Sequence, residues 1–118
     1  MPREYGRNRR VADLVLRELA VCIQRELSDT KLKFVTVSAV DVSPDLKNAK
    51  VYVTSLEDDL DKDRIVKDLN ERAGHYRHLL SQRLSLRSVP RLTFVFDYSV
   101  ERGRRLTGLI DAVSKHDE

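Results

Sequence analysis

Apolar side chains recur at helical spacing in the first part of the chain, between Arg9 and Leu27. Polar residues fill the opposite side of the helical wheel, and Leu14 and Val21, which lie among them, are expected to be partly exposed. The pattern predicts an amphipathic helix with Asn8 as its N-cap, ending near the poor helix formers "SDTK". The apolar side of this helix consists of Val11, Ala12, Val15, Leu16, Leu19, Ala20, Cys22, Ile23 and Leu27.

Three stretches rich in β-branched and aromatic residues predict strands. The first, "FVTVSAVDV", covers residues 34–42, and the second, "AKVYVTSL", covers residues 49–56. The short "SPDLKN" segment between them, with Pro44 at a turn position, favours an antiparallel hairpin. The third strand, "RLTFVFDYS", follows Pro90 and places Leu92, Phe94 and Phe96 on one face.

A second helical pattern lies between the hairpin and the last strand, after the acidic run "EDDLDKD". One apolar stripe continues through Gly74, which predicts two helical segments with a bend between them. Glycine costs a helix about 1 kcal/mol relative to alanine, so its presence there calls for a reason. An alternative is that Gly74 only permits close packing of helix against sheet. The stripe consists of Ile65, Val66, Leu69, Ala73, Tyr76, Leu80 and Leu84.

The order of elements is therefore α-β-β-α-kink-α-β, followed by a tail with a short, weak helix or irregular structure. Residues 1–118 are expected to form a single α+β domain with a three-stranded sheet and the helices on one face. The first few residues and the tail are expected to be mobile. The chain has no apolar run long enough to span a membrane and no apolar signal core, so a cytoplasmic protein is expected.

Positive charge is concentrated in one segment. The chain carries a net charge of only +3, but residues 72–105 hold eight arginines, no lysine and the two acids Asp97 and Glu101. A solvated surface is the ordinary interpretation of a run of charges. Arginine, however, suits bidentate contacts with phosphate and stacking on bases better than lysine does. The segment therefore favours a nucleic-acid partner.

The sequence lacks the residue sets that catalysis and metal binding require. Cys22 is the only cysteine, which excludes an intrachain disulfide and a cysteine-rich zinc site, and a small buried side chain is expected there. His75 and His78, with Glu71, could share a helix face and bind a metal, but no fourth ligand is evident. We therefore expect no catalytic residue, no metal and no cofactor.

The order of elements resembles the type II K-homology fold of RNA-binding modules. Those modules carry Gly-x-x-Gly between the paired helices, which lets the protein approach the nucleic-acid backbone. One family with this fold, ribosome-binding factor A, has an Ala-x-Gly kink instead. In this chain the corresponding residues are Arg72, Ala73 and Gly74, so the glycine matches and arginine stands in place of the alanine. Three further stretches carry the resemblance: "GRNRRVADLVLRELAVCIQREL", "TVSAVDVSPDLKNAKVYVT" and "SLRSVPRLTFVFDYSVERGRRL".

The resemblance implies a non-catalytic assembly factor that binds the immature 30S ribosomal subunit and assists late maturation of 16S rRNA. It also implies a role in cold adaptation, release by a maturation GTPase, and a monomeric state. The alternative is a protein-interaction module whose basic face binds an acidic protein partner; only an RNA-binding protein would bind isolated rRNA in a salt-dependent way. The residues expected to contact RNA are Arg3, Arg7, Arg9, Arg10, Arg72, Gly74, Arg77, Arg83, Arg87, Arg91, Arg102, Arg104 and Arg105.

Overall fold

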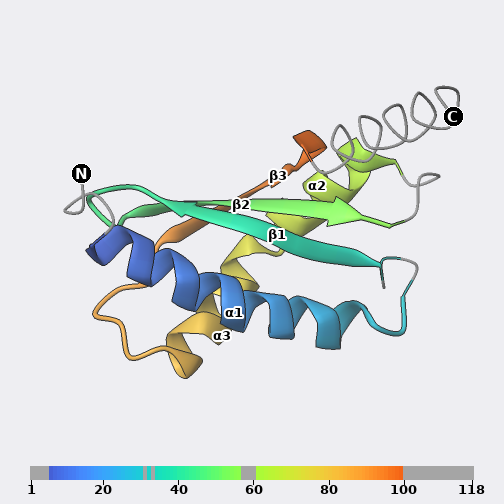
Figure 1. Cartoon of the computed structure of the whole chain (residues 1–118). Coiled ribbons are helices and arrows are strands. Elements are labelled where there is room, and N and C mark those ends of the chain that lie inside the picture. The colour runs from blue at the N-terminus through green and yellow to red at the C-terminus, as the bar shows by residue number, and fades with distance from the viewer. Residues whose placement is uncertain (1–5, 31, 33, 57–60, 100–118) are drawn as a thin grey trace, which may run out of the picture.

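A computed structural model of the chain describes residues 6–30, 32, 34–56 and 61–99 (Figure 1). The expectations about the first residues and the tail, including its helix, lie outside the described residues. The elements are α1 (Arg7–Leu27), β1 (Val35–Val42), β2 (Asn48–Ser55), α2 (Lys62–Glu71), α3 (Ala73–Arg83) and β3 (Arg91–Phe96). These elements confirm the predicted order.

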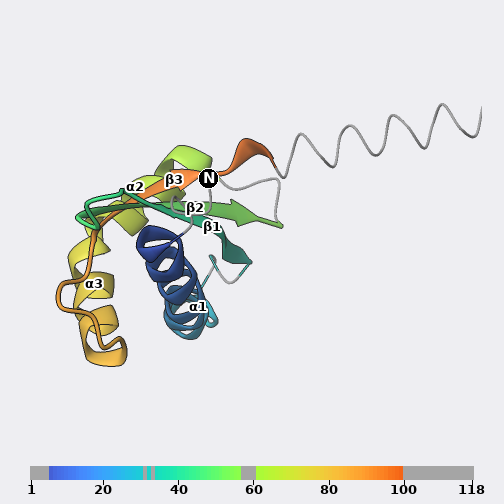
Figure 2. The same ribbon diagram turned by 60° about the vertical axis from the view of Figure 1, so that its left-hand side comes forward.

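The three strands form one sheet in the order β1-β2-β3. Strands β1 and β2 form the expected antiparallel hairpin, and β3 runs parallel to β2, with Val51 opposite both Val40 and Phe94. The register of β1 shifts between Val37 and Ala39. Helices α1 and α3 lie side by side on one face of the sheet, and α2 runs beside β3 (Figures 1 and 2). The structure thus confirms the expected α+β class.

The core lies between this face of the sheet and the helices. Residues at alternate positions of β2 and β3, such as Val51 and Phe94, are buried there beside the apolar side of α1. Tyr76 of α3 is fully buried, with its ring 5.9 Å from that of Phe94 in an edge-on arrangement. Leu14 is 39% exposed, as its position among polar residues predicted.

The break between α2 and α3 is confirmed, but it is centred on Arg72 instead of Gly74. Arg72 has φ −97° and ψ 5°, and its amide donates to the carbonyl of Leu69. Gly74 lies in the first turn of α3 without a positive φ, and a β-carbon placed on it would meet no atom within 4 Å. Close helix–sheet packing therefore does not explain this glycine, and that alternative is wrong.

The start of α1 also differs from the prediction. Gly6 precedes the helix, and no side chain caps it, so Asn8 lies inside the first turn and is not the N-cap. The Asn8 side chain has a different partner, because its Nδ2 donates to the carbonyl of Val42 at 3.3 Å. Asn8 therefore ties the start of α1 to the end of β1. Among the described residues, no helix is both long and apolar enough to cross a membrane.

Candidate nucleic-acid interface

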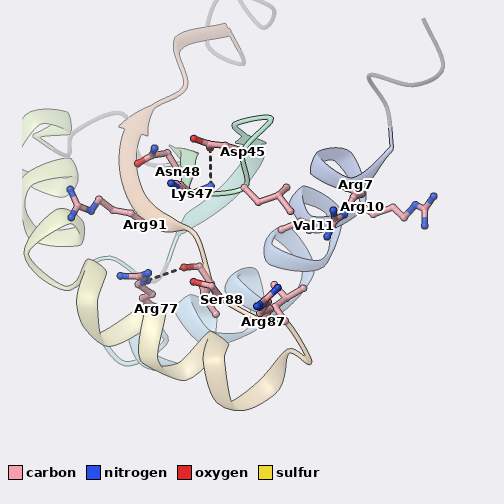
Figure 3. A pocket seen from close by; sticks show the side chains of 13 residues that line it. Arg7, Arg10, Val11, Asp45, Lys47, Asn48, Arg77, Arg87, Ser88 and Arg91 are labelled. Atoms are coloured by element: carbon pink, nitrogen blue, oxygen red, sulfur yellow. Dashed lines mark hydrogen bonds between the residues drawn. The ribbon is translucent and has the colours of Figure 1, made fainter.

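A groove of ≈ 1010 Å³ opens at the end of the sheet where β2 and β3 begin (Figure 3). We call it the basic groove, because six of the described residues that line it carry positive charge and, among these described residues, only Asp45 carries negative charge. Its lining residues are Arg7, Arg10, Val11, Asp45, Leu46, Lys47, Asn48, Arg77, Leu86, Arg87, Ser88, Val89 and Arg91.

Three segments that are distant in sequence form the walls of the basic groove. The first turns of α1 supply one wall, the β1–β2 turn a second, and α3 with the loop before β3 a third. In Figure 3, Arg7 and Arg10 lie on one side of the groove, and Arg77 and Arg87 lie on the side of α3. The groove thus receives cations from opposite walls.

Three hydrogen bonds hold these walls in place. The bond from Asn8 to the Val42 carbonyl fixes the α1 wall to the hairpin. The amide of Arg91 donates to the Lys47 carbonyl at 2.8 Å and joins the β1–β2 turn to β3. Nε of Arg77 donates to the Val89 carbonyl at 3.0 Å and fixes the loop against α3. These bonds fix the walls of the groove relative to one another, which lowers the entropic cost of binding.

Asp45 organises the β1–β2 turn, although it is the acidic residue of the groove. Its Oδ1 accepts hydrogen bonds from the Ser43 hydroxyl at 2.6 Å and from the Lys47 amide at 3.0 Å. These bonds, that from Ser43 first, lower the pKa of the Asp45 carboxyl. These hydrogen bonds hold the carboxylate in the turn. The cations that line the groove outnumber it.

The sequence-predicted RNA contacts fall into separate groups. Five of the predicted arginines gather in the basic groove: Arg7, Arg10, Arg77, Arg87 and Arg91. Gly74 lies three residues before Arg77 on α3, and therefore on the same side of that helix. Arg9 and Arg72 do not line the groove. Arg3, Arg102, Arg104 and Arg105 lie outside the described residues.

Arg83 lies on the exposed side of α3 and also takes part in the contact between α1 and α3. Its Nε donates to Glu18 Oε2 at 2.8 Å. Further along the same two helices, His75 pairs with Glu26. The partners are eight residues apart on both helices, which run antiparallel here. Arg83 is thus engaged within the protein and is a weaker candidate for an RNA contact than the groove arginines.

Sequence reasoning missed Lys47 because it considered only runs of arginine. Lys47 lies in the hairpin turn, which the sequence identified only as a turn. Parallel pairing of β2 with β3 brings this turn beside the loop before β3. A chain order that places a helical crossover between two strands is the signal that would have found it, because such strands are usually parallel.

The histidines and the cysteine show no catalytic arrangement in the described part of the chain. Cys22 is buried, and burial raises the pKa of its thiol, which disfavours the reactive thiolate. His75 is held by Glu26. No group of three or more His, Cys, Asp or Glu residues that could hold a metal occurs among the residues that the structure describes.

Comparisons with known proteins identify the same family in sequence and in structure. The profile of the ribosome-binding factor A family matches residues 7–110. Ribosome-binding factor A of Nitrosococcus oceani is 53% identical over 119 residues, covering 100% of this chain and 94% of the relative. That of Coxiella burnetii is 44% identical over 112 residues, covering 95% of this chain and 93% of the relative.

Solved structures agree with the sequence relatives. The crystal structure of ribosome-binding factor A from Thermus thermophilus has a TM-score of 0.65 at 28% identity, covering 75% of this chain and 94% of that chain. A homology model of the Thermus thermophilus factor, fitted into a cryo-EM map of its 30S complex, has a TM-score of 0.62 at 26% identity. That comparison covers 74% of this chain and 91% of the other.

Proposed function

Because the chain belongs to the ribosome-binding factor A family, we propose that it is a non-catalytic assembly factor that binds the small ribosomal subunit through its basic groove. The Thermus thermophilus relative fitted into a map of a 30S complex supports this partner. In this proposal the protein acts as a cytoplasmic monomer, assists late maturation of 16S rRNA, supports growth in the cold, and is released by a maturation GTPase.

The charge of the basic groove is the observation that carries the proposal. Its described lining residues include one acid, Asp45, and six cations: Arg7, Arg10, Lys47, Arg77, Arg87 and Arg91. RNA presents a regular array of phosphates, and arginine forks match phosphate oxygens in geometry as well as in charge. Cations on opposite walls suit a backbone that passes through the groove.

Binding of this kind has a characteristic dependence on salt. Each neutralised phosphate releases condensed counterions, so the logarithm of affinity falls linearly with the logarithm of salt concentration. Around six phosphate contacts would lower the affinity by about a thousandfold between roughly 50 and 200 mM salt. An RNA-binding groove should therefore lose about one unit of slope for each contacting arginine removed.

The test compares two double variants of equal charge change. Arg10→Ala with Arg87→Ala removes one cation from each of two facing walls of the groove. Arg17→Ala with Arg25→Ala removes two exposed cations of α1 that do not line it. Binding to purified small subunits and to isolated 16S rRNA is measured at several salt concentrations. Only the groove variant is expected to bind more weakly and with a lower slope.

Two other outcomes would point elsewhere. If the parent protein binds subunits but not isolated rRNA, and binding follows an acidic ribosomal protein, the chain is a protein-interaction module with a basic face. If both double variants bind equally well, the groove is not the RNA surface. The maturation role is tested separately, by whether the groove variant fails to restore 16S rRNA processing in the cold in cells that lack the protein.

A further inference from the structure

Building on the RNA-binding function proposed above, we propose that the basic groove binds RNA at a nucleotide that has left its helical stack. The base lies on an apolar floor to which Leu46 contributes, and the neighbouring phosphates lie on the arginine walls. The ligand class is therefore a bulged or looped RNA nucleotide, and not a regular duplex. Leu46 is the residue that makes the non-ionic contact.

The first observation is that the groove is not lined by charge alone. Val11, Leu46, Leu86 and Val89 line it together with the six cations. Val11 and Val89 are buried and belong to the core, whereas Leu46 and Leu86 are only partly buried and leave apolar surface in the groove. Phosphates remain hydrated and gain nothing from that apolar surface. The face of a base, in contrast, is a flat apolar surface that gains from leaving water.

The second observation is the backbone conformation of Leu46. It has φ 64° and is the only non-glycine residue with a positive φ among those that the structure describes. Leucine seldom adopts this left-handed conformation, which glycine and asparagine tolerate much better. Residues held in such conformations cluster at binding sites, where the surrounding structure enforces them.

The turn around Leu46 supplies that enforcement. The Leu46 amide donates to the Ser43 carbonyl at 2.9 Å, and the Asn48 amide donates to the Ser43 hydroxyl at 3.1 Å. Asp45 accepts from the Lys47 amide on the other side of Leu46. The turn thus holds the apolar side chain of Leu46 and the cation of Lys47 at neighbouring positions of the groove wall. In this proposal the first contacts the base of a nucleotide and the second contacts its phosphate.

The polar groups of the groove complete the arrangement. Asn48 and Ser88 also line it, and their side chains can both donate and accept hydrogen bonds at a base edge. None of the described lining residues is aromatic, so the base contact proposed here is dispersion against aliphatic side chains. Leu46 also packs partly against the core. The experiment must therefore distinguish base binding from the alternative that Leu46 serves only to pack against the core.

The experiment measures affinity for three short RNA hairpins. One carries a single bulged nucleotide, the second an abasic residue at the bulge, and the third is fully paired. The parent protein is expected to bind the bulged hairpin about tenfold more tightly than either of the others, a difference of the size expected when one aliphatic side chain is covered. Equal affinity for the bulged and the abasic hairpin would overturn the proposal.

Two variants then separate base contact from phosphate contact. Leu46→Gly, whose glycine accepts the positive φ, is expected to abolish the preference for the bulged hairpin and to leave the salt slope unchanged, because no phosphate contact is lost. Arg87→Ala is expected to weaken binding of all three hairpins and to lower the slope. Thermal unfolding of both variants is recorded, and Leu46→Asn replaces Leu46→Gly if the latter does not fold.

The outcomes distinguish the two proposals. If Arg87→Ala and the double variant Arg10→Ala with Arg87→Ala bind every RNA like the parent, the RNA-binding function of the groove fails. If these variants weaken binding but Leu46→Gly keeps the preference for the bulge, the groove binds RNA and only the base contact at Leu46 is wrong. A loss of preference in a folded Leu46→Gly protein supports the proposal, since packing alone would not distinguish a base from an abasic site.

Discussion

Asn70 of α2 occupies both backbone hydrogen-bonding groups of Phe94 in β3. Its Nδ2 donates to the Phe94 carbonyl at 3.0 Å, and its Oδ1 accepts from the Phe94 amide at 2.7 Å. The neighbouring ladder bonds, such as that from the Asp97 amide to the Val53 carbonyl, leave β3 toward β2. The Phe94 groups therefore point to the outer edge of the sheet, where one amide side chain takes the place of a further strand.

Asn70→Ala should destabilise the protein by about 1–3 kcal/mol, because it leaves a partly buried amide and carbonyl without partners. Urea unfolding at neutral pH measures this. Asn70→Asp provides the matched control, because it keeps the acceptor but sets a carboxylate oxygen against the Phe94 carbonyl. Its deficit should shrink as the pH falls and the introduced carboxyl is protonated and can donate. An equal deficit at all pH values would show that the paired hydrogen bonds are not what Asn70 supplies.

Tyr76 should make the protein sensitive to alkaline pH. Tyr76 is 0% exposed, and burial, followed by the charge of Glu26, raises its pKa from 10.0 to about 12. Its hydroxyl makes no hydrogen bond of normal geometry among the described residues, although the Glu26 and Arg72 side chains lie close enough to affect its pKa. The folded protein thus holds this proton more tightly than the unfolded chain does. The resulting stability is fully present below pH 10 and is lost as the pH rises toward 12.

Tyr76→Phe is the variant that tests this. At pH 7 it should be neutral or stabilising by up to about 1 kcal/mol, because a buried hydroxyl without a partner is removed. Its free energy of unfolding should also fall less than that of the parent above pH 10. Both proteins contain the same lysines and other tyrosines, so the difference between them isolates Tyr76. Parallel stability curves between pH 9 and 11 would contradict the raised pKa.

Gly74→Ala should stabilise the fold by about 0.5–1 kcal/mol, since a methyl group has open space there and alanine is the better helix former. Thermal unfolding measures the change. If RNA passes close to the start of α3, the same methyl group should weaken binding to the small subunit. Ala73→Gly, one residue earlier, tests the reverse effect on stability. A loss of stability in Gly74→Ala would show that the first turn of α3 is more crowded than the structure indicates.

Arg83→Ala and Arg87→Ala should distinguish a residue of the α1–α3 contact from a residue of the basic groove by their effects on RNA binding. Arg83→Ala removes a surface ion pair with Glu18, which contributes little to stability, and should leave RNA affinity and the salt slope unchanged. Arg87→Ala should leave stability unchanged and lower the salt slope by about one unit. The two variants have the same charge change and lie four residues apart. If Arg83→Ala weakens binding as much as Arg87→Ala does, total charge and not the groove governs affinity.

The sequence allowed the elements of the fold to be predicted because each has a local signal. The apolar stripe of α1, the turn residues around Pro44 and the β-branched runs act over a few positions, and the observed bounds agree closely with them. What failed depends on distant partners. Asn8 was assigned to a cap, yet its partner Val42 lies 34 residues away. The ion pair of Arg83 with Glu18, which lies 65 residues away, was likewise not predicted.

For the candidate site, too, local features of the sequence were predicted and contacts between distant segments were not. Composition identified arginine as the relevant residue type, and five of the predicted arginines do gather in one groove. Their grouping depends on the parallel pairing of β2 with β3, which brings the Lys47 turn to Arg91. No local sequence pattern indicates that the turn at Lys47 and the start of β3 at Arg91 lie side by side. The positive φ of Leu46 is equally absent from the sequence, where leucine in "SPDLKN" gives no sign of a left-handed residue.

The walls of the basic groove come from the two ends of the described fold, since Arg7 begins α1 and Arg91 begins β3. A ligand that touches both walls would therefore act as a reversible cross-link between segments that separate when the chain unfolds. It would raise the midpoint of thermal unfolding in proportion to the logarithm of its concentration. It would also slow hydrogen exchange most in the first turn of α1, which the bond from Asn8 to the Val42 carbonyl fastens to the hairpin. RNA bound in this groove would thus stabilise the fold of the protein for as long as it remains bound.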